Sequence, residues 1–312
     1  MTLITTFLTG IQNLIYGLID DQSIPVALLS FTGFLFVVFV VKIHELRSKE
    51  EPITKKVVIQ SLFGGMKTMN SLIHNIIRSL SFFALTWFLL MTADYCLKAD
   101  MNIGITFSIL CLAVVFQTLY GWIVYKESVS IQALIGISMI IMGVVGISLT
   151  KSSNKSSASN SNSEISQADK DYYQAMAITL SIICSFIYFL RAAQAKYLAV
   201  RGYSAFDFSI DSGLTTGIFC LICSIYFFLI NHPAYTLKNI ILSFILSVLL
   251  MLNALLGLTA IVKGPMGPTQ AIIQSNSAFT TILSVIFLGL VPSVIQVTAL
   301  IVIILGVVVT LL

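Results

Sequence analysis

Long apolar runs separated by short polar breaks occupy most of this 312-residue chain. A helix that crosses a bilayer needs roughly 20 mostly apolar residues, and runs of this kind recur along the whole sequence. We predict helices at 3–20, 25–43, 79–98, 102–125, 131–150, 172–199, 205–230, 238–261, 266–289 and 292–311. The pattern therefore predicts an all-α membrane protein with about ten transmembrane helices.

Two polar stretches interrupt the series of apolar runs. Residues 151–171 are rich in Ser and Asn and cannot bury apolar surface, which is typical of a flexible linker. Residues 44–78 form an insertion in which apolar positions at helical spacing are interspersed with basic side chains, and this favours an interfacial helix over a span. We therefore expect two five-helix halves, 1–150 and 172–312, of which the first carries the insertion.

The composition excludes a water-soluble fold. Of all residues, 57% are hydrophobic and 10% are charged, whereas about a quarter of the residues in an ordinary soluble domain are charged. The net charge is +4, but the 17 Lys and Arg residues are scattered among the polar breaks and form no basic patch. We therefore expect membrane lipids as partners and no nucleic acid.

Lys and Arg are unequally distributed over alternate polar breaks. One side of the predicted membrane receives twelve of them, with the insertion 44–78, and the other side receives five. The positive-inside rule places the richer side in the cytoplasm, together with both chain termini. Asn154 then lies on the opposite side in an Asn-Lys-Ser glycosylation sequon, for which a chance match in an Asn- and Ser-rich linker is the alternative. The sequence leaves open whether the membrane is the plasma membrane or an endomembrane.

The two halves carry an internal repeat. A shift of 163 residues superimposes Ile140–Val145 on Ile303–Val308, and Gly104 on Gly267, without a gap. Each copy contains five predicted helices, an odd number, so the copies must enter the membrane in opposite directions. Two inverted five-helix repeats of this kind are typical of many secondary transporters.

One part of this repeat resembles a known family. The stretch Gly104–Leu149 is similar to the fourth and fifth spans of EamA-like members of the drug/metabolite transporter superfamily. The matching features are Val124–Glu127 at the end of one span, Gly136 and Gly143 in the next, and Phe287–Pro292 with Gly306 in the second copy, which lacks the Glu. The resemblance implies ten helices in inverted repeats, a midplane cavity, and transport of metabolites such as nucleotide sugars, amino acids or amines.

Polar side chains deep within the apolar runs are the candidates for a substrate cavity, because hydrocarbon penalises them unless they face protein or water. This set comprises Gln12, Asn13, Gln117, Tyr120, Asn253, Gln270, Gln274, Asn276 and Ser277. Helical spacing places Gln270, Gln274 and Ser277 on one face of a single helix. Interhelical hydrogen bonding is the alternative role for any one of them, but as a cluster they predict an uncharged polar pocket.

Four charged residues are candidates for gating or charge pairing. Glu127 is predicted at a cytoplasmic helix end, where it acts in gating or is simply a solvated end charge. Arg191 lies inside the sixth predicted helix and is either functional or extended toward the lipid headgroups. Asp207 and Asp211 lie one turn apart and can pair with Arg191 or Arg201, with proton coupling as the sharper alternative.

The predicted function is a secondary transporter that moves a small polar metabolite by alternating access through a central cavity. Its partners are a small-molecule substrate and lipids, and a homodimer is left open. The sequence contains no metal-ligand set, phosphate-binding Gly-Lys motif or nucleophile elbow, so we expect no metal, cofactor or enzymatic activity. The alternative is a non-transporting scaffold or regulator on a degenerate transporter fold, which the missing Glu of the second copy favours.

Overall fold

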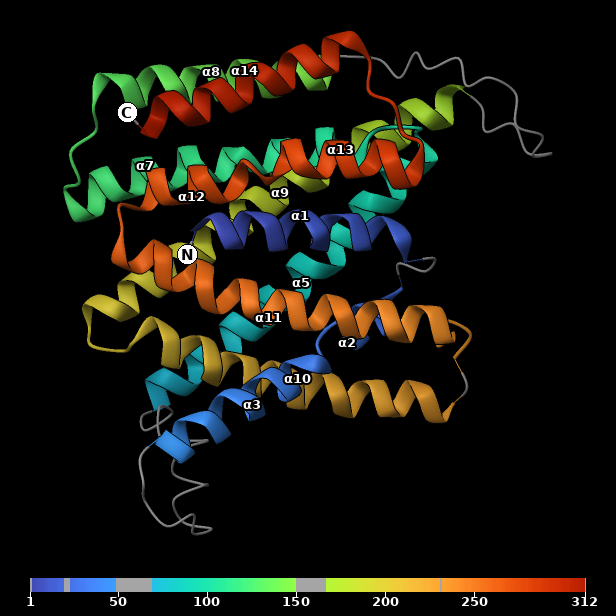
Figure 1. Cartoon of the computed structure of the whole chain (residues 1–312), viewed down its shortest axis with the longest axis vertical. Helices are drawn as coiled ribbons and strands as arrows, with labels where there is room; N and C mark the ends of the chain where they lie inside the picture. Colours follow the sequence, from blue (N-terminus) through green and yellow to red (C-terminus); the bar gives the residue numbers. More distant parts are fainter. Residues whose placement is uncertain (1, 20–22, 49–68, 150–166, 231, 312) are drawn as a thin grey trace. The chain divides into compact units, whose positions relative to one another are not determined.

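The computed structural model describes residues 2–19, 23–48, 69–149, 167–230 and 232–311 (Figure 1). Within these residues the secondary structure is helical throughout, and they contain no β-strand. This confirms the predicted all-α class.

All ten predicted apolar runs coincide with helical segments. The helices are α1 (Thr2–Leu18), α2 (Ile24–Leu29), α3 (Gly33–Ser48), α5 (Met69–Lys98), α6 (Ile103–Phe107), the 3-10 helix η1 (Ser108–Cys111), α7 (Leu112–Tyr125), α8 (Ile131–Leu149), α9 (Gln167–Val200), α10 (Ala205–Leu229), α11 (Leu237–Lys263), α12 (Met266–Gln274), α13 (Asn276–Leu288) and α14 (Val294–Leu311). Three runs that the hydropathy pattern joins, 25–43, 102–125 and 266–289, are each divided into shorter helical pieces.

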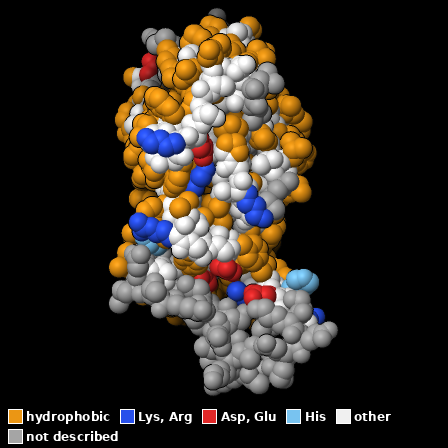
Figure 2. Space-filling model, turned by 90° about the vertical axis from the view of Figure 1, so that its left-hand side faces the viewer, with side chains coloured by type: hydrophobic (Ala, Val, Ile, Leu, Met, Phe, Trp, Pro, Cys, Tyr) orange, Lys and Arg blue, Asp and Glu red, His pale blue; other side chains and the backbone are white. Residues whose placement is uncertain are grey.

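Seven helical stretches of the described residues are long and apolar enough to cross a membrane. They are Ile24–Glu45, Ser71–Lys98, Ile103–Tyr125, Ala168–Val200, Ala205–Leu229, Leu237–Lys263 and Met266–Leu288, and the apolar helices α8 and α14 are shorter. Hydrophobic side chains cover most of the described surface on the face shown in Figure 2. Elsewhere in the described residues, Phe219 and Ile222 on α10 are 56% and 64% exposed. Outward-facing apolar side chains on long helices fit a multi-pass integral membrane protein, whereas ten spans remain a prediction.

The start of α5 differs from the sequence interpretation. An interfacial helix ending near residue 78 was expected before a separate span at 79–98, but α5 continues unbroken from Met69. Ile73 and Ile77 are about half exposed on this helix while Asn75 is buried. Apolar side chains facing outward and polar ones facing inward are what lipid surroundings require, so the described part of this segment, residues 69–78, is continuous with the predicted span.

Two further sequence predictions fall largely on residues that the structure does not describe. Residues 49–68, which contain most of the predicted interfacial segment, lie outside the described part, as does the candidate glycosylation site Asn154. The predicted linker 151–171 is described only from Gln167, where α9 begins.

The chain forms two compact units. Unit 1 comprises residues 1–18, 88–190 and 264–312, and unit 2 comprises residues 19–87 and 191–263. Each unit therefore takes helices from both predicted sequence halves. The long helices α5 and α9 each contribute one end to unit 1 and the other to unit 2.

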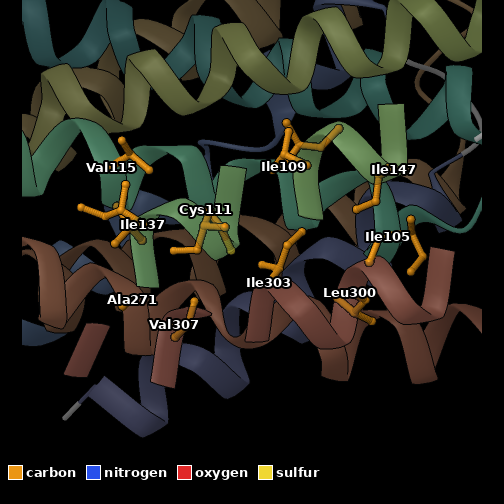
Figure 3. Close-up of a cluster of buried hydrophobic side chains, with 14 residues drawn as sticks. Ile105, Ile109, Cys111, Val115, Ile137, Ile147, Ala271, Leu300, Ile303 and Val307 are labelled. Carbon is orange, nitrogen blue, oxygen red and sulfur yellow. The ribbon is translucent and has the colours of Figure 1, made fainter. Parts of the chain in front are cut away.

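The apolar core of unit 1 lies where α6, η1, α7, α8, α12 and α14 meet (Figure 3). It contains Ile105, Ile109, Cys111, Val114, Val115, Ile137, Ile140, Val144, Ile147, Ala271, Ala299, Leu300, Ile303 and Val307. Helices α8 and α14 approach closely because Gly136 faces the carbonyl of Gly306, where a Cβ would collide with the backbone. Small residues allow such contact between helices in a membrane.

Unit 2 is built from α2, α3, α10 and α11 with the adjoining ends of α5 and α9. Gly33 on α3 lies against Ser247 on α11, and Gly213 on α10 lies against Met251 on α11. A smaller apolar cluster, which includes Leu198, Phe208 and Leu258, joins α9, α10 and α11. Unit 2 therefore has an apolar cluster of its own.

Candidate functional site

The functional candidates of unit 1 gather around two broken helices. The first predicted run, 102–125, is α6, a four-residue 3-10 turn and α7, and the second, 266–289, is α12 and α13 with Ser275 between them. A 3-10 turn and an interruption between two helices leave backbone groups outside the regular α-helical hydrogen bonding. The breaks face each other, since the Cys111 Sγ lies 3.8 Å from the carbonyl oxygen of Gln274.

The two broken helices run antiparallel along their whole length. Gly104 contacts the backbone of Thr281, Cys111 contacts Gln274, and Gly267 contacts Thr118. Each step of seven residues up the first helix is therefore matched by a step of seven residues down the second. At Gly104 and Gly267 a Cβ would overlap the facing helix, so glycine is what permits the close approach.

Eight of the nine predicted cavity residues lie in unit 1, and seven of these eight are at most 3% exposed. These seven are Gln12 and Asn13 on α1, Gln117 on α7, Gln270 and Gln274 on α12, and Asn276 and Ser277 on α13. The single helical face expected for Gln270, Gln274 and Ser277 is interrupted, because α12 ends at Gln274 and α13 begins at Asn276. We call these seven residues the polar cluster.

Part of the polar cluster is hydrogen-bonded and fixes α1 against α13. The Asn13 amide nitrogen donates to Asn276 Oδ1 at 3.0 Å and to Thr280 Oγ1 at 3.3 Å. Asn276 in turn donates to the carbonyl oxygen of Ile273 at 2.7 Å, close to the break between α12 and α13. These bonds satisfy part of the hydrogen-bonding capacity of Asn13 and Asn276.

The rest of the polar cluster has more donors and acceptors than partners. Both amide atoms of Gln117 are sealed from solvent without a hydrogen-bond partner, as are Asn13 Oδ1 and Ser277 Oγ. Gln117 itself is 0% exposed. A buried polar group left unpaired costs about 1–3 kcal/mol, and in native proteins such groups are normally satisfied by water or a ligand. The hydrogen-bonding capacity of these buried atoms is thus not used by the surrounding side chains and backbone.

The other two predicted cavity residues, Tyr120 and Asn253, are less buried than this cluster. Tyr120 is half-buried and packs edge-on against the rings of Tyr125 and Phe189, at centroid distances of 5.7 and 5.5 Å. Asn253 is half-buried on α11, in unit 2. Tyr120 therefore contacts aromatic rings on α7 and α9, and its place in a cavity stays a prediction.

Glu127 lies directly beyond α7, against the start of α12. Its carboxylate accepts a hydrogen bond from the Met266 backbone N–H at 3.4 Å and lies over Gly121. The N-cap of α12 is Pro265, which supplies no side-chain cap, so a carboxylate at this helix N-terminus is favourable. The geometry gives Glu127 a role in positioning α12.

The equivalent place at the start of α6 is capped differently. Asn102 Oδ1 accepts hydrogen bonds from the backbone N–H groups of Gly104 and Ile105, at 2.9 and 3.3 Å. Its amide nitrogen donates to the carbonyl oxygen of Leu290 at 2.6 Å. The start of α6 therefore contacts the residue Leu290 that follows α13, through the Asn102 amide. The start of α12 contacts the residue Glu127 that follows α7, through the Glu127 carboxylate.

The remaining charged candidates lie in unit 2. Asp211 is buried and accepts a hydrogen bond from the Tyr203 hydroxyl at 2.5 Å, whereas Asp207 is exposed. The Arg191 guanidinium stands over the Phe82 ring, 3.4 Å from its centroid. Arg201 stands over Tyr197 at 3.8 Å. The structure therefore places these cations on aromatic rings and gives Asp211 a tyrosine partner.

Tyr203 keeps its proton in this arrangement. Burial raises the pKa of its hydroxyl above the usual value, and donation to the Asp211 carboxylate raises that pKa further. The amide nitrogen of Asn75 donates to the same hydroxyl at 3.2 Å. Asn75, Tyr203 and Asp211 thus form a short chain of hydrogen bonds that joins α5, the connection before α10, and α10.

Sequence reasoning missed Arg78 as a functional candidate. It was counted among the basic residues outside the spans, but it is 3% exposed on α5. A signal was available: Asn75, Arg78, Phe82, Leu85 and Leu89 are spaced three or four residues apart and are all buried. This face continues the core-facing side of the predicted third helix back through Arg78.

The described segments contain scattered His, Cys, Asp and Glu side chains. No group of three or more His, Cys, Asp or Glu side chains in them could hold a metal ion. Cys220 and Cys223, which form a C-x-x-C sequence on α10, are free thiols.

Comparison with known proteins shows a fold and no family. No protein-family model and no curated protein matches the chain. A solved structure, described as a crystal structure of a protein, is similar with a TM-score of 0.59 and 12% sequence identity. The match covers 98% of this chain and 96% of that chain. At this identity the similarity concerns the fold alone, and it extends over essentially the whole chain.

Proposed function

We propose that this chain is a secondary transporter that moves a small polar metabolite across a membrane by alternating access through a cavity lined by the polar cluster. The observation that carries the proposal is the Gln117 side chain, which is fully buried with both amide atoms unpaired. An amide held in this way can donate to and accept from a polar ligand at once. Discontinuous helices beside such groups are a recurrent way to build transporter binding sites.

The proposal includes ten spans arranged as two inverted repeats. Contacts in unit 1 support it, because they recur after the 163-residue shift with the two partners exchanged. Gly136 faces the carbonyl of Gly306, and their shifted counterparts, Ala299 and Gly143, also face each other. Two copies related by a two-fold axis produce contacts of this kind.

A second pair of contacts follows the same rule. Gly104 contacts Thr281, and the shifted counterparts Gly267 and Thr118 contact each other as well. The positions that end α7 and α13, Lys126 and Gly289, are also related by the shift, and both have left-handed backbones. The resemblance of these motifs to EamA-like transporters is part of the proposal, with the substrate class left open among metabolites, amino acids and amines.

A binding measurement followed by flux tests this function. Purified protein is melted against a panel of nucleotide sugars, nucleosides, amino acids, amines and sugar phosphates, since a ligand of the folded state raises the melting temperature. A compound that stabilises is then assayed for uptake into liposomes. Gln117→Ala and Gln274→Ala should each reduce uptake roughly tenfold or more, because a hydrogen bond to the ligand is lost. Gln132→Ala removes an exposed amide on α8 and serves as the matched control.

Gln117→Leu separates a ligand contact from a structural role. If Gln117 awaits a ligand, this change removes two unpaired buried atoms and should leave the ligand-free protein as stable or more stable, while abolishing the ligand response. A large drop in melting temperature without ligand would assign Gln117 to the scaffold. Unchanged uptake in both alanine variants would exclude the proposed cavity, and binding without flux would favour the non-transporting alternative.

A further inference from the structure

Two arginines are buried close together in unit 2. Arg78 on α5 is 3% exposed and Arg191 on α9 is 7% exposed. Their guanidinium carbons lie 5.4 Å and 3.4 Å from the centroid of the same Phe82 ring. The two charged groups are therefore no further apart than the sum of these distances. Two like charges this close in a buried place repel each other.

The surroundings hold Arg78 in position without neutralising it. Its Nη1 donates to the backbone carbonyl oxygen of Arg191 at 2.6 Å, and its guanidinium also lies 5.4 Å from the Phe208 ring centroid. Aromatic rings attract a cation but carry no net charge. The side chain is thus oriented by α5, α9 and α10, while its charge stays uncompensated by these contacts.

The acidic neighbour in unit 2 is engaged elsewhere. Asp211 accepts its hydrogen bond from Tyr203, and Arg78 takes part in no ion pair with a residue that the structure describes. The Arg78 Nε is sealed from solvent and has no hydrogen-bond partner. A buried cation without a counter-charge is strongly unfavourable, and in a membrane protein it marks a functional position.

We propose that Arg78 and Arg191 form an anion site that binds a phosphate group. Guanidinium groups present parallel N–H donors that match the oxygens of phosphate in a bidentate manner. A phosphate monoester carries about −1.5 to −2 charges near neutral pH, which suits two adjacent cations better than a single carboxylate does. Both guanidiniums lie near the same Phe82 ring, which keeps the two cations close enough to share one ligand.

The phosphate can come from a soluble metabolite or from a lipid headgroup, and binding measurements distinguish the two. Full-length protein in a neutral detergent is titrated with inorganic phosphate while its melting temperature is followed. In a second arm, the protein is placed in nanodiscs of phosphatidylcholine with or without phosphatidic acid. Stabilisation by inorganic phosphate supports the site and a soluble source. Stabilisation by phosphatidic acid alone supports the site and assigns the phosphate to a headgroup.

Substitutions at Arg78 test the assignment to this pair. Arg78→Lys keeps the charge but loses the planar fork, so the phosphate concentration needed for half of the shift should rise about tenfold. Arg78→Gln should abolish the shift. Arg201→Lys is the matched control, because Arg201 also stands over an aromatic ring but is exposed, and it should respond as the unchanged protein does. If neither Arg78 variant folds, Arg191→Lys is measured with the same expectation as Arg78→Lys.

A response to neither phosphate nor phosphatidic acid, or an equal response in the Arg78 variants, would overturn the proposal. Binding at this site is measured without any flux. Its failure therefore leaves the transport function untouched, and a failure of transport leaves the anion site standing.

Discussion

Lys126 ends α7 in a left-handed backbone conformation, with a φ angle of 57°. A residue with a Cβ loses roughly 1–2 kcal/mol in this conformation, whereas glycine adopts it freely. The equivalent turn at the end of α13 uses Gly289, with a φ angle of 68°. The same turn is therefore made once with the favourable residue and once with an unfavourable one.

Lys126→Gly should stabilise the protein by about 0.5–1 kcal/mol, because it removes this backbone strain. Chemical unfolding in detergent measures the change. Gly289→Ala is the reverse control: no atom lies within 4 Å of the added Cβ, so any loss of stability reports the backbone alone. A less stable Lys126→Gly variant would mean that the lysine side chain stabilises this turn by more than the strain costs.

At the scale of residues, the sequence predicts which polar side chains are buried better than it predicts their hydrogen-bond partners. Gln117 and Gln274 stand out because hydrocarbon penalises amides within apolar runs, and both are buried in unit 1. The hydrogen bond between Asn13 and Asn276 joins residues 263 positions apart, which no local spacing indicates. Arg78 was missed for a related reason, since a basic residue near a helix end is normally assigned to the membrane surface.

At the scale of elements, the close packing of the two broken helices of unit 1 can be tested at Gly104 and Gly267. A Cβ at Gly104 would overlap the backbone of Thr281, which cannot move aside, so Gly104→Ala should cost about 1–3 kcal/mol of stability. At Gly267 the obstacle is the Thr118 side chain, which can rotate once it gives up its bond to the Val114 carbonyl. Gly267→Ala should therefore cost less.

Gly146→Ala on α8 is the matched control for these two changes. Its added Cβ would lie 3.4 Å from the Ala299 side chain, and alanine is the better helix former, so stability should be unchanged or higher. Melting temperatures in one detergent compare the three variants. Equal behaviour of Gly104→Ala and Gly146→Ala would contradict the close packing of α6 against α13.

Hydropathy located every predicted helix but none of the helix breaks. The runs 25–43, 102–125 and 266–289 are apolar throughout, so a window average has nothing to detect at Thr32, Cys111 or Ser275. These breaks arise where helices far apart in the sequence meet, as Cys111 meets Gln274. The local hydropathy pattern indicates which residues are buried and which segments are helical. It carries no information on the tertiary contacts at which the helices break.

At the scale of the whole molecule, the compact units do not follow the order of the chain. Unit 1 combines α1, near the start, with α12, α13 and α14, near the end. The two predicted halves, 1–150 and 172–312, are the copies of the sequence repeat, and they do not coincide with the two compact units. Each unit takes elements from both halves.

This interleaving predicts that neither half is stable alone. In a fragment of residues 1–158, Ile140 and Val144 on α8 would lose the partners Ile303 and Val307, and Asn13 would lose Asn276. The fragment should aggregate or be degraded when expressed by itself. Coexpression with residues 159–312 should give a complex that copurifies through a tag on one fragment and melts within a few degrees of the intact chain.

Gly136→Leu in the first fragment should prevent association, because its side chain collides with the Gly306 backbone. A monodisperse fragment 1–158 with its own cooperative melting would show that the first half folds independently, contrary to the composition of unit 1.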